Sequence, residues 1–287
     1  MKRNSFCALL GLKVNGVFMT VSTDFQTSCY SLKTEGSLVV LHFSGDIFQL
    51  GTSLSEKERL LSALKLADAS PAIKAILFLN SPEVLGDKKY TRFVKEAIKA
   101  RHGQSSNVIK AKPQKNSSVQ LERLTNMIIQ LVSVILASSK LVIVGLEGHI
   151  ASPFLGVSLV ADYRFGTDEM TFQPSHLKLG TLPVGGLGFM LPRFVGQEKA
   201  RDLLLSQSEI SAHDLEVMGL LDGHFPQEGF QDACIRKANE LADIPHSAIK
   251  GFKAVSHPYA KDLKNFLQYE NTTFLNLIYC RKSERCL

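Results

Sequence analysis

The sequence predicts an α/β fold, because three short apolar runs are separated by segments with helical spacing. Residues 37–43, 72–79 and 141–146 are rich in aliphatic and β-branched side chains, as buried strands are. Residues 54–67 place apolar side chains three or four positions apart, directly after the capping candidates Thr52 and Ser53. Strands that alternate with helices in this way form parallel sheets.

The same rules predict the remaining elements. Residues 101–120 are polar, with Pro113 near their centre, and predict a long loop or a partly disordered insertion. The others, in chain order, are a helix at 119–137, strands at 161–165 and 170–172, a glycine-rich turn at 180–188, helices at 196–206 and 211–219, and amphipathic helices from 230 to 278.

Composition excludes several classes of protein. A net charge of +6 over 287 residues is too diffuse to indicate nucleic-acid binding. Five scattered cysteines with no CxxC pair indicate neither a disulfide framework nor a zinc site, so we expect no metal. The longest largely apolar run, residues 127–137, is shorter than the roughly 20 residues that cross a bilayer. We therefore expect no membrane span, a cytoplasmic protein, and an untargeted N-terminal extension at residues 1–30.

An ordered set of motifs lies within residues 141–226. Ala161 and Asp162 end a predicted helix, Phe172 lies in a short strand, and residues 179–183 read Leu-Gly-x-x-Pro. Leu-Pro-Arg at 191–193 follows, with Ile-Ser-Ala and Gly-Leu further on. This order resembles the central part of the enoyl-CoA hydratase/isomerase, or crotonase, superfamily, and weaker similarity covers most of the chain beyond the extension.

The resemblance implies a crotonase fold, in which ββα turns form a spiral. It implies a core domain at residues 31–225 and a C-terminal helical oligomerisation region at residues 226–287. It also implies an acyl-CoA or acyl-carrier-protein thioester as substrate or ligand, no further cofactor, and a homotrimer or hexamer.

In the family, two backbone N–H groups polarise the thioester carbonyl as an oxyanion hole. The resemblance places the first N–H at Val84, in a loop that includes Gly86, and the second at Pro153. Proline has no N–H. The second position therefore needs a shift of one residue, so that Ser152 or Phe154 supplies the donor.

Hydratases of the family also use two glutamates for the water and the proton. The resemblance places these glutamates at Gly156 and His176, so we do not expect hydration by that route. His176 either carries the proton itself or fills the space of a lost glutamate. Ser152 and His176 could form a Ser/His pair, although no carboxylate is in view to orient the imidazole.

Two functions remain open at this point. The chain is either a crotonase-family isomerase or lyase that acts on an acyl thioester by isomerisation or decarboxylation, or a non-catalytic crotonase-fold pseudoenzyme that binds an acyl thioester or a protein. N–H groups of Ser152 and Phe154 that face a closed pocket beside His176 would favour catalysis. A pocket filled by Phe154 and Leu155 would favour the binding protein.

Overall fold

The computed structural model describes residues 9–14, 17–22, 24–103 and 117–279. The described strands are β1 (Leu9–Val14), β2 (Val17–Ser22), β3 (Phe25–Gln26), β4 (Tyr30–Glu35), β5 (Leu38–Phe43), β6 (Ala75–Asn80), β7 (Leu141–Leu146), β8 (His149–Ala151), β9 (Tyr163–Thr167), β10 (Thr171–Gln173), β11 (Ile210–Ser211) and β12 (Gly223–Phe225).

A seven-stranded sheet occupies the centre of the molecule, in the order β12-β9-β7-β6-β5-β4-β3. Its strands from β12 to β5 are parallel, and β4 and β3 continue the edge in antiparallel pairing. Strands β8, β10 and β11 form a second sheet, and β1 and β2 form a hairpin. The mixed α/β architecture agrees with the predicted fold class.

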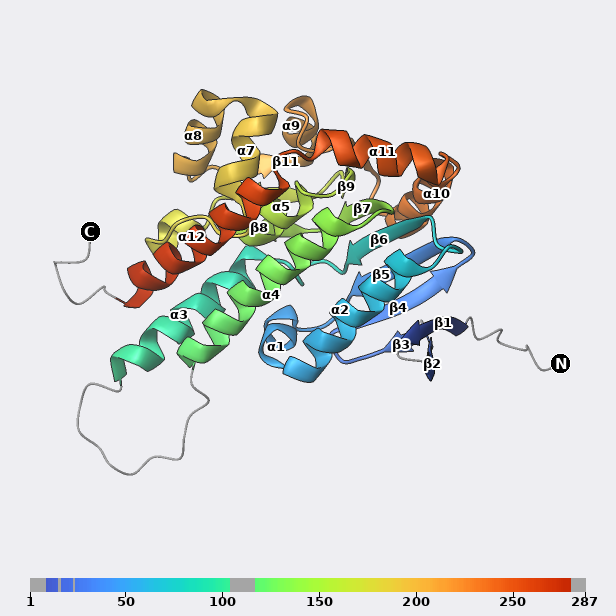
Figure 1. Cartoon of the computed structure of the whole chain (residues 1–287). Coiled ribbons are helices and arrows are strands. Elements are labelled where there is room, and N and C mark those ends of the chain that lie inside the picture. Colours follow the sequence, from blue (N-terminus) through green and yellow to red (C-terminus); the bar gives the residue numbers. More distant parts are fainter. Residues whose placement is uncertain (1–8, 15–16, 23, 104–116, 280–287) are drawn as a thin grey trace.

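Helices connect and cover these strands. They are α1 (Ile47–Thr52), α2 (Leu54–Ala69), α3 (Asp87–Gly103), α4 (Ser117–Ala137), α5 (Ser152–Ser158), α6 (His176–Leu179), α7 (Leu187–Val195), α8 (Gln197–Leu205), α9 (Ala212–Val217), α10 (Phe230–Ala242), α11 (His246–Ser256) and α12 (Ala260–Tyr279). Figure 1 shows α3, α4 and α12 side by side, and the three helices pack on one another. On the other face of the large sheet, Phe230 and Cys234 of α10 join the apolar cluster of Leu38 and Leu77. Because both faces are covered, β6 and β7 are buried along their whole length, which explains their continuous apolar sequences.

Side-chain caps fix where several helices begin. The Asp46 carboxylate accepts from the N–H groups of Phe48 and Gln49 at the start of α1. Ser53 caps α2 through the N–H of Glu56, and Ser211 caps α9 through the N–H of Asp214.

Asp162 anchors α11 to the central sheet. Its carboxylate accepts from the N–H of Val142 on β7 at 2.7 Å and from Lys253 Nζ at 2.8 Å. Lys253 also donates to the carbonyl of Lys140 at 2.9 Å. The Ala-Asp motif that ends the predicted helix therefore has a structural role in joining two parts of the fold.

Several sequence-based boundaries were wrong. No strand was predicted before residue 37, but β3 and β4 form there, because β4 can pair with the otherwise open edge of β5. Helix α3 continues to Gly103 and α4 begins at Ser117, so the expected loop at 101–120 is shorter at both ends; residues 104–116 lie outside the described residues. The four-residue helix α6, which begins at His176, was not predicted.

Helix α4 contains the apolar run at 127–137 within a longer apolar segment. Residues Val119–Ala137 are long and apolar enough to cross a membrane by length and composition alone. Leu121, Leu124 and Val132 of this helix are buried in the main apolar cluster. Packing inside the domain accounts for the apolar face of α4.

Candidate functional site

Ser152 and His176 form a hydrogen-bonded pair inside the protein. Ser152 Oγ lies 3.2 Å from His176 Nδ1, and His176 Nε2 lies 2.9 Å from the carbonyl oxygen of Leu204. The pairing of β8 with β10 brings the two residues together, because Ala151 lies opposite Gln173. Ser152 directly follows Ala151, and His176 lies shortly after Gln173. Both side chains are buried, with Ser152 0% and His176 2% exposed.

The partners of His176 fix its protonation. A carbonyl oxygen only accepts, so His176 Nε2 carries the proton and donates to Leu204. His176 Nδ1 is then the acceptor for the Ser152 hydroxyl. Burial lowers the pKa of His176, and the bond to the Leu204 carbonyl opposes that shift. A neutral imidazole next to a serine hydroxyl is the arrangement of a general base and its proton donor.

Backbone contacts close the space around the start of α5. Pro153 lies in the first turn of this helix and supplies no N–H. A Cβ added to Gly185 would lie 2.4 Å from the carbonyl oxygen of Pro153, and one added to Gly156 would lie 2.6 Å from the carbonyl oxygen of Gly185. No side chain fits at Gly156 unless one of these backbones moves.

Two N–H groups of the loop after β6 are hydrogen-bonded within the loop itself. Val84 donates to the carbonyl oxygen of Ser81 at 3.2 Å, and Gly86 donates to that of Glu83 at 3.4 Å. The carbonyl of Leu85 accepts from the N–H of Ala151 at 2.9 Å, which ties this loop to the strand that leads into α5. The two loops are therefore joined directly.

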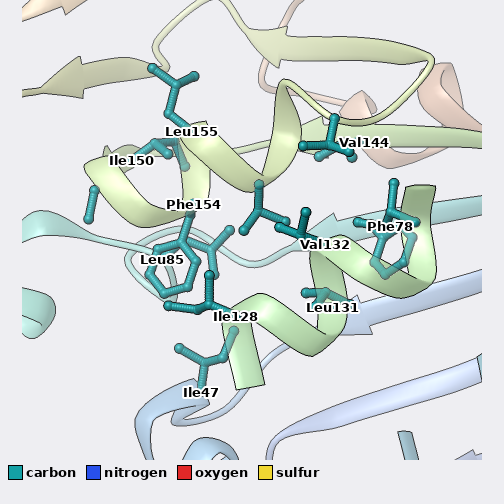
Figure 2. Packing of buried hydrophobic residues seen from close by; sticks show 14 of the residues in the cluster. Ile47, Phe78, Leu85, Ile128, Leu131, Val132, Val144, Ile150, Phe154 and Leu155 are labelled. Atoms are coloured by element: carbon teal, nitrogen blue, oxygen red, sulfur yellow. The ribbon is translucent and has the colours of Figure 1, made fainter. Parts of the chain in front are cut away.

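Phe154 fills the apolar space between these loops. Its side chain is 7% exposed and lies edge-on to the ring of Phe48, with 6.2 Å between ring centroids. Figure 2 shows Phe154 pointing toward Leu85 and Ile128, while Leu155 points away from them. The cavity that remains beside Phe154 and Leu85 has a volume of about 40 Å³. That is room for about one water molecule, whereas a pocket for a small-molecule ligand measures about 300–1,000 Å³.

A larger cleft lies beside α1. It has a volume of about 830 Å³ and is lined on its apolar side by Phe48 and Phe93 and on its polar side by Asp46, Gln49 and Arg123. Its volume lies within the range of ligand pockets. Phe48 lines this cleft and also contacts Phe154, so the cleft lies next to the closed region.

Comparison with known proteins identifies the scaffold. The family model described as enoyl-CoA hydratase/isomerase matches residues 109–286, which is more than half of the chain. The chain belongs to the enoyl-CoA hydratase/isomerase family.

Solved structures share the fold at low sequence identity. An enoyl-CoA hydratase from Bacillus halodurans superposes with a TM-score of 0.68 at 18% identity, over 88% of this chain and 95% of that one. HypX from Aquifex aeolicus superposes with a TM-score of 0.69 at 18% identity, over 95% of this chain and 45% of that one.

Curated relatives match over shorter stretches. The probable enoyl-CoA hydratase EchA12 of Mycobacterium tuberculosis is 30% identical over 110 residues, which is 38% of this chain and 39% of the relative. The 4-chlorobenzoyl coenzyme A dehalogenase-1 of an Arthrobacter species is 32% identical over 91 residues, or 32% of this chain and 33% of the relative. The chain thus matches these relatives over two fifths of their length or less.

The residues suggested by the family resemblance can now be placed. Ser152 and His176 are in contact, Pro153 and Phe154 lie in the first turn of α5, and Val84 and Gly86 lie in the loop tied to that helix. Gly156 lies one turn further along α5, against the turn that contains Gly185. In the described part of the chain, no group of three or more His, Cys, Asp or Glu side chains is placed to hold a metal ion.

One buried carboxylate near the start of α5 was not predicted from the sequence. Glu270 of α12 accepts from the N–H of Gly185 at 2.8 Å and from that of Gly186 at 3.1 Å. Burial raises the pKa of Glu270 to about 8, against the lowering effect of these two bonds. Residues 171–188, which begin with the Phe172 segment, contain no Asp or Glu, whereas Glu270 lies 85 positions beyond Gly185 along the chain. Only its place among apolar positions of an amphipathic helix signalled burial.

Proposed function

We propose that this member of the enoyl-CoA hydratase/isomerase family binds an acyl thioester through the crotonase fold and does not hydrate it. The observation that carries this proposal is the closed space at α5, where Phe154 leaves a cavity of about 40 Å³. Pro153 has no N–H and the N–H of Val84 is bonded to the carbonyl of Ser81, so neither position that the resemblance assigns to the oxyanion hole offers a free N–H, and only a shifted donor at Ser152 or Phe154 is left for a thioester carbonyl. Loss of one such donor costs roughly 10²–10³ in rate.

Binding is supported by the cleft beside α1. Its volume of about 830 Å³ suits a ligand of the size of a thioester's carrier group. Helix α3, which contributes Phe93 to the cleft, also carries the exposed residues Lys88, Arg92 and Lys95. Such side chains favour the phosphates of a nucleotide or of a carrier arm.

A second candidate function is catalysis by His176. The chain of hydrogen bonds from Ser152 through His176 to the Leu204 carbonyl favours it, because the imidazole is neutral and held in one orientation. In this case His176 would carry the proton in an isomerisation or a decarboxylation, after Phe154 had moved to admit the acyl chain.

Assembly into a homotrimer or hexamer is part of the proposal. Helix α12 buries Leu263, Leu267 and Phe274 within its own chain, so this apolar stripe is already used. Helix α11 instead exposes Phe252 and Val255, which are 66% and 77% accessible, and these supply apolar surface for contact between copies. Analytical ultracentrifugation at several protein concentrations tests this; a monomer at all of them contradicts it.

The experiment that tests binding is a thermal-shift titration with acetyl-CoA, crotonyl-CoA and a medium-chain acyl-CoA, with free CoA for comparison. A ligand present at about 100 times its Kd adds roughly 2.7 kcal/mol to the stability of the folded state. We expect a saturable shift with free CoA and all three thioesters, and little dependence on chain length because the acyl pocket is closed. No shift with any ligand contradicts thioester binding and leaves a protein partner.

A further inference from the structure

A second Ser–His pair lies at the carboxyl ends of the central strands. Ser81 Oγ lies 3.1 Å from His42 Nε2, and both residues are partly exposed. His42 is the penultimate residue of β5, and Ser81 follows the last residue of β6. His42 lies opposite Leu79, and Phe43 lies opposite Asn80. This parallel register places the side chains of His42 and Ser81 together at the carboxyl ends of the two strands. Ligands of open α/β sheets bind outside the carboxyl ends of the strands.

The turn after β6 holds Ser81 in a fixed position. Its N–H donates to the carbonyl of Phe43 at 2.8 Å, and its own carbonyl accepts from the side chain of Asn80 at 2.9 Å. Pro82 restricts the backbone of Ser81 to extended conformations. Glu83 then adopts a positive φ of 66°, which is unusual for a residue with a side chain. Strained backbone of this kind is concentrated at functional sites.

A buried carboxylate lies within electrostatic range of His42. Glu147 is 4% exposed, and its two oxygens accept from Gln227 Nε2 at 3.0 Å and Gln231 Nε2 at 3.1 Å. Asn80 fixes the backbone of Glu147 through both its N–H and its carbonyl. Burial lowers the pKa of His42, Glu147 raises it, and Lys33 lowers it. His42 is therefore neutral near pH 7, and Glu147 would stabilise its protonated form.

We propose that Ser81 is a nucleophile with His42 as its general base, and that it accepts the acyl group of an activated ester or thioester. Ser81 Oγ forms a bond to the carbonyl carbon while its proton passes to His42 Nε2. The carbon–sulfur or carbon–oxygen bond then breaks, and the leaving group takes the proton from His42. Water hydrolyses the acyl-serine, which releases a carboxylic acid and restores Ser81. Glu147 is a positioning residue in this scheme.

This inference goes beyond thioester binding and does not depend on it. The pair at Ser81 differs from that at Ser152 in exposure: Ser81 is partly exposed, so we expect a reagent to reach it from solvent, whereas Ser152 is 0% exposed. A serine-directed reagent therefore distinguishes the two pairs in the folded protein.

The test is labelling of the full chain with a fluorophosphonate probe, in which a serine oxygen displaces fluoride from phosphorus. Intact mass gives the number of labels, and peptide mapping of the wild-type protein locates them without any variant. We expect one label, at Ser81, and loss of at least 90% of the labelling rate in Ser81→Ala and His42→Asn. Ser44→Ala is the matched control, since Ser44 is an exposed serine at the end of β5.

Each other outcome overturns the proposal. Labelling that is absent from wild-type protein, spread over several serines, or equally fast in His42→Asn shows that Ser81 is not activated by His42. Circular dichroism melting verifies that each variant is folded, and the peptide map of wild-type protein decides the matter if one is not.

The role of Glu147 has its own readout. The charges that act on His42 are those of Glu147 and Lys33. Glu147→Gln removes the negative charge, so the pH at which the labelling rate reaches half its maximum falls. An unchanged pH profile shows that Glu147 does not position or stabilise His42.

Discussion

The two Ser–His pairs of this protein differ in what surrounds the same hydrogen bond. Ser152 and His176 are buried, although His176 lines a cleft of about 470 Å³ together with Leu182 and Leu204, and the second nitrogen of His176 is bonded to the Leu204 carbonyl. Ser81 and His42 have nearly the same separation but are partly exposed at the carboxyl ends of β5 and β6, near a buried carboxylate. A Ser–His contact by itself therefore does not identify a reactive site. Access and the charge that faces the imidazole decide whether it can react.

The largest expected effect tests whether the Ser152 region is closed by its backbone. Gly156→Ala places a Cβ 2.6 Å from the carbonyl oxygen of Gly185, so we expect a loss of about 3 kcal/mol in the free energy of unfolding. Gly251→Ala is the control, since nothing lies within 4 Å of its Cβ on exposed α11. That change is expected to be neutral or to stabilise by up to about 1 kcal/mol. Equal stability of the two variants in urea unfolding would show that the region is not tightly closed.

The next effect compares the two histidines directly. His176→Ala leaves the buried Ser152 hydroxyl without its partner and removes the bond to the partly exposed Leu204, which should cost about 2 kcal/mol. His42→Ala leaves Ser81 able to bond water, so we expect a cost below about 1 kcal/mol. Chemical denaturation of both variants measures the difference. A larger loss of unfolding free energy in His42→Ala than in His176→Ala would contradict the conclusion that Ser152–His176 is the buried pair.

Glu270, which is bonded to the glycine turn beside α5, should make the free energy of unfolding depend on pH. Its pKa in the folded protein is about 8, above the usual carboxyl value in the unfolded chain. The folded state therefore holds a proton that the unfolded state releases, and stability falls as pH rises through the window from about 4.5 to 8. The slope from this residue is up to about 1.4 kcal/mol per pH unit.

Glu270→Gln should remove that slope, because the amide oxygen still accepts from the glycine turn but does not ionise. Unfolding free energies at pH 5, 6, 7 and 8 measure it. Glu169→Gln, on the exposed turn between β9 and β10, is the control and should keep the wild-type slope. Parallel pH profiles for wild type and Glu270→Gln would refute the assignment.

Sequence alone predicted the scaffold and one of the two pairs. The apolar runs of β5, β6 and β7 and the ordered motifs after residue 141 were sufficient for the α/β fold and the family. Ser152 and His176 were named because the motif positions differ from the family pattern, yet their contact depends on the pairing of β8 with β10.

Other parts of the two regions depend on contacts that no local pattern encodes. Glu270 reaches Gly185 from a helix about 85 positions away, and Gln231 reaches Glu147 across 84 positions. The contact of His42 with Ser81 could have been predicted from the sequence, since both residues lie at the ends of adjacent predicted parallel strands. The filling of the cavity by Phe154 follows from tertiary packing against Phe48 and Leu85.

The central claim is that the α5 region is closed to hydration chemistry, and turnover of crotonyl-CoA tests it most directly. Loss of the conjugated double bond is followed by absorbance with wild-type protein and with a buffer blank. We predict no hydration above the blank. A kcat/KM at or above about 10⁴ M⁻¹s⁻¹, within the ordinary range of enzymes, would show that an oxyanion hole forms at α5 and would contradict the account.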